Sequence, residues 1–120
     1  MEQVLQLVAE SSGQLGLLVE LKPEGGNGAA LTKAVQQAVE QSGVGESLLF
    51  MSQDYPSVAA LQQAHPEWWV GYCAYASSGD LDEGVWQYEI DFLAVEESMV
   101  TNRLTRLARS QCLPLYVWSV

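Results

Sequence analysis

Two spacings of apolar residues alternate along the chain. Runs of consecutive apolar residues predict strands buried on both faces, and apolar residues recurring every three or four positions predict amphipathic helices. The predicted strands are Leu17–Lys22, Ser47–Met51, Trp68–Ala74, Ile90–Val95 and Leu115–Val120. The predicted helices run over Glu2–Ser11, over Gly28–Ser42, from Tyr55 to His65, and over Met99–Gln111 with Ser98 as its cap. This rhythm predicts one α/β domain over residues 1–120, with about five parallel strands alternating with helices.

The stretch Leu17–Lys22 carries the first candidate chemistry. Glu20 and Lys22 stand two residues apart in a predicted strand, so their side chains point to the same side. They come at the carboxyl end of that strand, just before Pro23, where parallel α/β folds keep their active sites. The pattern fits a functional pair, but spacing alone favours an ordinary ion pair, because strand ends are often polar.

Charge narrows the choice of partner. The chain has 15 acidic and 5 basic residues, a net charge of −10. Phosphate backbones are bound by lysine and arginine, so this balance argues against nucleic acid and against an anionic membrane surface. A divalent cation could still bridge the chain to an anionic substrate.

Other polar residues are weaker candidates. His65 is the only histidine, and it falls at a predicted helix end on the side away from the strands' carboxyl ends, which predicts a surface or capping role. Four more polar residues follow strands and are expected to be loop or capping residues: Ser52, Asp54, Asp80 and Glu96.

For the adjacent Trp68 and Trp69, we expect one in the core and the other packed under helices. Cys73 and Cys112 lack metal-type spacing and are expected to be buried thiols.

Five segments match motifs of one enzyme family, in the same order and at strand ends. They are Leu18–Pro23, Phe50–Tyr55, Pro66–Tyr72, Asp91–Glu96 and Tyr116–Val120. The first holds a Glu-Leu-Lys motif, and the last differs from the family's Val-Trp-Thr-Val strand by Ser119 in place of threonine. On these segments the chain resembles the glycerophosphodiester phosphodiesterase family. It looks closest to the branch whose members carry an amino-terminal membrane region.

The resemblance implies a fold and three site residues. The family fold is a (βα)8 barrel, of which this chain would supply a partial TIM-type barrel from the carboxyl-terminal part of the catalytic domain. Glu20 would be a ligand of Mg²⁺ or Ca²⁺, hard cations that prefer oxygen. Lys22 would face the substrate phosphate, and Trp118 would contact the glycerol moiety. The parent enzyme would hydrolyse glycerophosphodiesters to glycerol 3-phosphate and an alcohol.

The part of the family domain that carries the His-Arg-Gly and His-Asp motifs has no counterpart here. We therefore expect no catalytic residue in this chain, which would be inactive alone. One alternative is a standalone non-catalytic α/β protein that self-associates or scaffolds a partner. Another is an enzyme whose catalytic half is on a separate chain. In each case the uncovered strand edges of a partial barrel predict a homo-oligomer.

The chain shows no signal peptide and no apolar run long enough for a membrane span. We therefore expect the chain itself to be soluble and cytoplasmic. The likeness to the membrane-type branch points to a membrane-anchored parent.

Overall fold

The computed structural model describes residues 1–75 and 83–119. Five parallel strands form one sheet in the order β1-β2-β3-β4-β5, so neighbours in sequence are neighbours in space. The strands are β1 (Leu17–Leu21), β2 (Leu48–Ser52), β3 (Trp69–Ala74), β4 (Phe92–Glu96) and β5 (Leu115–Trp118). The helices are α1 (Glu2–Glu10), α2 (Gly28–Ser42), α3 (Tyr55–Ala64) and α4 (Asn102–Ser110). This is the predicted partial TIM-type barrel, with strands and helices alternating.

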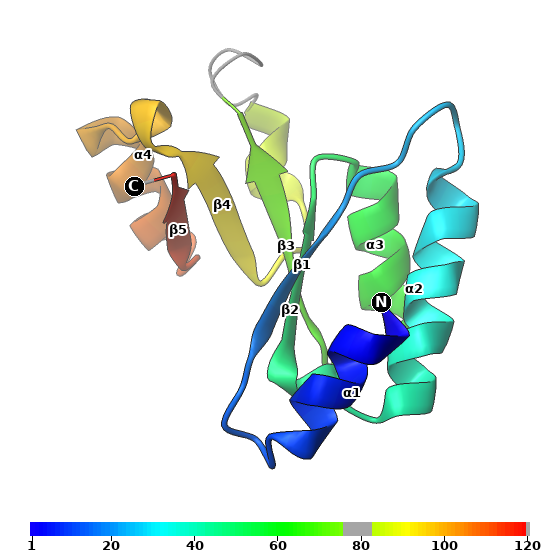
Figure 1. Cartoon of the computed structure of the whole chain (residues 1–120). Helices are drawn as coiled ribbons and strands as arrows, with labels where there is room; N and C mark the ends of the chain where they lie inside the picture. Colours follow the sequence, from blue (N-terminus) through cyan, green and yellow to red (C-terminus); the bar gives the residue numbers. More distant parts are fainter. Residues whose placement is uncertain (76–82, 120) are drawn as a thin grey trace.

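Figure 1 shows the strands as a curved row, with α1, α2 and α3 gathered against β1–β3 and α4 beside β5. The helices cover one side, the outer face, where an apolar core includes Phe50, Leu61 and Val70. A second outer core around Leu93 and Val95 packs against Leu104 of α4. In each strand, every second side chain points to the outer face and packs against the helices there.

The opposite side of the sheet, the inner face, would line the interior of a closed barrel. Strand register sets Glu20 beside Met51, Met51 beside Gly71, and Gly71 beside Phe92. Gly71 leaves room for the Phe92 ring, because a Cβ there would lie only 2.4 Å from a ring carbon. Leu18, Trp69 and Tyr116 are 51%, 48% and 45% exposed, so much of the inner face is apolar and open.

The structure corrects three expectations. Helix α4 begins at Asn102 and not at Met99, because the Thr101 hydroxyl accepts a hydrogen bond from Leu104 N and a separate 3-10 turn occupies Glu97–Met99. Trp68 packs under the helices, in the outer core with Leu61 of α3, but Trp69 is not buried in a core and lies exposed on the inner face. Cys73 is buried, whereas Cys112 is exposed, and both thiols are free.

None of the helices in residues 1–75 and 83–119 is long and apolar enough to cross a membrane.

Candidate functional site

Glu20 and Lys22 meet at the carboxyl edge of the sheet, as the sequence predicts. Glu20 is the fourth residue of β1, and Lys22 follows the strand directly. Parallel alternation places both side chains on the inner side. They border a cleft of about 450 Å³ that is lined by Glu20, Leu21, Lys22, Pro23, Glu24, Gln53, Asp54 and Tyr75.

The two charged groups form only a loose pair. Lys22 Nζ lies 3.7 Å from Glu20 Oε2, and the two side chains are 69% and 21% exposed, respectively. An ion pair at this distance and exposure adds little stability. The ammonium group of Lys22 is therefore accessible from the cleft for an anionic ligand.

Tyr75 also belongs to this site, although the sequence analysis did not select it. Its hydroxyl donates a hydrogen bond of 2.7 Å to Glu20 Oε1, across 55 positions in the chain. The carboxylate, together with burial, raises the pKa of Tyr75 to about 12, so the phenol stays protonated at neutral pH. Alternate residues of β3, namely Trp69, Gly71 and Cys73, face the inner side, and position 75 continues this alternation. The alternation could therefore have identified Tyr75 as an inner-face residue from the sequence.

Trp118, the third predicted site residue, reaches the same region through Tyr75. The two rings pack edge to face, with centroids 4.6 Å apart and planes at 68°. Trp118 Nε1 is buried beside the Cys73 thiol, a weak acceptor, and has no regular hydrogen-bond partner in residues 1–75 and 83–119. Burial and the charge of Glu20 raise the pKa of Cys73 to about 11, so it is a neutral thiol and not an activated nucleophile.

A metal site is not complete among these residues. Within the described part of the chain, no group of three His, Cys, Asp or Glu side chains could hold an ion. Divalent hard cations take six or more oxygen ligands, several of them from protein. Glu20 alone therefore does not fit a tight cation site, and its role as a metal ligand stays a prediction.

Ser52 and Glu96 are not the expected loop or capping residues, because each pairs with the neighbouring strand and ends β2 and β4, respectively. Ser52 Oγ donates to the Leu21 carbonyl at 2.7 Å and ties β2 to β1. Asp54 caps α3, accepting hydrogen bonds from the backbone and the hydroxyl of Ser57. Glu96 ends β4 beside Trp118 in the register. Asp80 lies outside the described residues.

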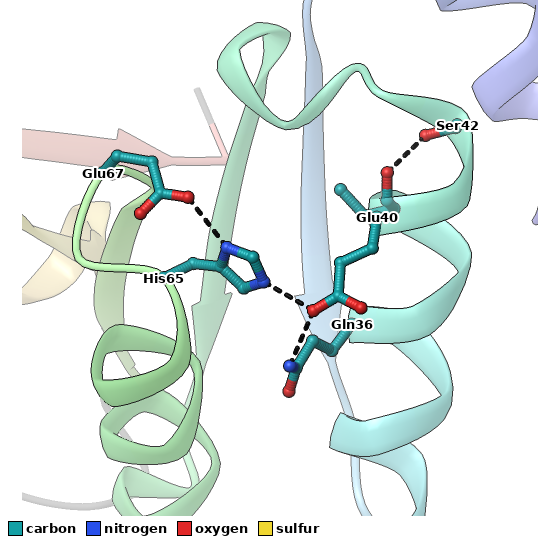
Figure 2. Close-up of polar contacts among 6 residues, drawn as sticks. Gln36, Glu40, Ser42, His65 and Glu67 are labelled. Atoms are coloured by element: carbon teal, nitrogen blue, oxygen red, sulfur yellow. Dashed lines mark hydrogen bonds and ion pairs between the residues drawn. The ribbon is translucent and has the colours of Figure 1, made fainter.

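His65 lies at the other end of the sheet, where α3 ends and β3 is about to begin. Figure 2 shows its ring between two carboxylates: Nε2 is 2.6 Å from Glu40 Oε1, and Nδ1 is 2.8 Å from Glu67 Oε1. The ring also stacks on Trp68, with centroids 3.7 Å apart. Hydrogen bonds to Glu40 and then Glu67 raise the pKa of His65. Both ring nitrogens are engaged within the fold. The backbone N–H of His65 donates to Leu61 O and caps the carboxyl end of α3, which agrees with the predicted capping role.

No family model and no curated protein matches this chain. Solved structures do. A protein from Silicibacter pomeroyi DSS-3 assigned as a glycerophosphoryl diester phosphodiesterase superposes with a TM-score of 0.87 and 20% identity, over 99% of this chain and 45% of its own. A glycerophosphodiester phosphodiesterase from Parabacteroides distasonis gives a TM-score of 0.80 and 16% identity, over 99% and 50%.

A third similar structure contains a ligand. It is a phosphodiesterase from Oleispira antarctica in complex with the product sn-glycerol-3-phosphate, with a TM-score of 0.82 and 19% identity, over 100% of this chain and 48% of its own. At these identities the likeness establishes the fold. The chain thus has the fold of part of the barrel in these phosphodiesterase structures and spans about half their length.

Proposed function

We propose that this chain forms one wall of a glycerophosphodiester phosphodiesterase active site. The observation that carries the proposal is the convergence of Glu20, Lys22 and Trp118, linked by Tyr75, at the carboxyl edge of a half-barrel. That edge is where barrel enzymes bind substrate. The likeness to phosphodiesterase structures, one of them with bound sn-glycerol-3-phosphate, supports the same reading.

Each residue then has a chemical task. Lys22 would bind the phosphate of a glycerophosphodiester, offsetting negative charge that grows during hydrolysis. The aromatic face of Trp118 would pack on the glycerol moiety. Glu20 would give one oxygen ligand to Mg²⁺ or Ca²⁺, in a site completed by residues outside the described part of this chain. We place the chain in the carboxyl-terminal part of the catalytic domain and, from its motifs, in the membrane-type branch.

Binding of sn-glycerol 3-phosphate to the chain tests the phosphate role. Two-dimensional NMR should show weak binding with shifts at the cleft residues, and Lys22→Ala should abolish it. Lys33→Ala is the matched control, because it removes the same charge from the exposed side of α2. Equal binding by both variants would show that Lys22 does not hold the phosphate.

Turnover tests the expected inactivity of the isolated chain. With glycerophosphocholine and Mg²⁺ or Ca²⁺, we expect no detectable release of glycerol 3-phosphate, since the chain offers no pair of acid/base histidines. Turnover that disappears in Glu20→Ala would contradict this expectation and make the chain an enzyme in its own right.

The open inner face supports a second candidate, a non-catalytic protein that self-associates. β1 and β5 are the edges of the sheet, and Leu18, Trp69 and Tyr116 are exposed on its inner face. Pairing two copies would cover these groups. Light scattering should then give about twice the 13.1 kDa chain mass, reduced to the monomer by Trp69→Lys but not by Leu7→Lys on the exposed side of α1. A monomeric wild-type chain would rule this candidate out.

A further inference from the structure

Tyr75 occupies an unusual place between two of the proposed site residues. It directly follows Ala74, the last residue of β3, and its hydroxyl passes over β2 to reach Glu20 on β1. Its ring is braced independently by the edge-to-face contact with Trp118 of β5. The phenol therefore joins the first and last strands of the described sheet at their carboxyl ends.

We propose that Tyr75 is a positioning residue that fixes the Glu20 carboxylate so that Lys22 remains available to a phosphate. This rests on the proposed function for its consequence in binding, but its geometry stands on the described contacts alone. Tyr75 holds Oε1 at 2.7 Å, while Oε2 stays 3.7 Å from Lys22 Nζ. The hydrogen bond from Tyr75 engages one carboxylate oxygen and orients the group, and in this orientation the other oxygen stands off from the ammonium group.

A tyrosine hydroxyl has one proton to donate, and Tyr75 donates it to Glu20 Oε1. Removing the hydroxyl would leave Glu20 with Lys22 as its nearest partner among the described residues. The carboxylate would then compete with an incoming phosphate for the same ammonium group.

A double-mutant cycle in urea denaturation tests the contact without any ligand. The losses of stability in Tyr75→Phe and Glu20→Gln should not add in the double variant, because each change breaks the same hydrogen bond. Tyr75→Phe combined with Glu24→Gln, the same change at another carboxylate of the cleft, should be additive.

Binding of sn-glycerol 3-phosphate tests the consequence. Tyr75→Phe should weaken binding by about threefold, the effect of a tightened surface pair, while Tyr72→Phe should bind as the wild type does. Unchanged binding by Tyr75→Phe, or losses of stability in Tyr75→Phe and Glu20→Gln that simply add, would overturn the proposal. If the wild type binds no glycerol 3-phosphate, the proposed function fails, and the double-mutant cycle alone decides whether Tyr75 positions Glu20.

Discussion

At the amino end of β3, Glu40 and Glu67 share the imidazole of His65, whereas at the carboxyl end of β1 Glu20 is shared between Tyr75 and Lys22. The bonds to His65 are 2.6 and 2.8 Å, and its ring also stacks on a buried tryptophan. At the other end, the corresponding charge pair is 3.7 Å apart and Lys22 is 69% exposed.

The two ends of the sheet show how a structural charge network differs from a candidate binding site. The charged groups around His65 pair with one another and connect α2 to the start of β3, so this network stabilises the fold. Glu20 and Lys22 border a cleft and leave a cation accessible to ligand. Both ends contain titratable groups, so the arrangement of partners, and not the presence of charge, marks the candidate site.

The largest expected effect is at the amino end, from Gly45→Ala. The new Cβ would lie 2.3 Å from Trp68 Nε1, and Trp68 is fixed between His65 and Phe50. Overpacking of this kind should lower the free energy of unfolding by about 1–3 kcal/mol in urea denaturation. Gly16→Ala, whose Cβ would meet only Ser47 O at 3.5 Å, is the matched control. Equal stability of the two variants would mean that the Trp68 region is loosely packed.

An intermediate effect should appear as a pH dependence of the same network. The pKa of His65 is raised above 6.5, so its contribution is full below that value and is lost as pH rises through the raised pKa. The pKa values of Glu40 and Glu67 are lowered from 4.5, so their contribution is present above that value and is lost as pH falls through the lowered pKa. The network should be strongest between about pH 4.5 and 6.5.

Thermal unfolding of the wild type and His65→Gln across this range measures the effect. The difference in Tm should be largest inside the window and should shrink toward alkaline pH. Because His65 is the only histidine, no other imidazole contributes. A difference in Tm that is constant with pH would show that the ring acts only through its stacking on Trp68.

The smallest effect on stability is expected at the carboxyl end. Lys22→Ala should change the free energy of unfolding by no more than about 0.5 kcal/mol, since the pair is long and exposed. Lys33→Ala should change the free energy of unfolding, measured by urea denaturation, by a similarly small amount. A large loss of stability in Lys22→Ala alone would place Lys22 with the structural network and weaken the contrast between the two ends.

Much of the fold could be read from the sequence because buried parallel strands and amphipathic helices leave clear spacings. The spacings predict the five strands and the four helices of the described residues to within a few positions. The start of α4 was misjudged because Ser98 and Thr101 are both good caps, and only packing selects between them.

The site was less visible. Glu20 and Lys22 could be paired by parity within one strand, but the contact of Tyr75 with Glu20 joins residues whose strands are separated by β2. Trp69 misled because its apolar ring suggested a covered position, while its parity placed it on the open inner face. Local spacing thus predicts which way a side chain points, and the assembled sheet decides what it meets.

The coincidence of sequence order and sheet order also bears on how the chain folds. Each pairing joins a strand to the next one in the sequence, as in Leu17 with Leu48, Leu49 with Trp69, and Gly71 with Phe92. The entropy lost in closing a loop grows only slowly with its length, so the longer connection from β1 to β2 costs little more than the others. Each strand and helix can therefore add to the edge left by the one before it, so that the sheet grows by stepwise accretion along the chain.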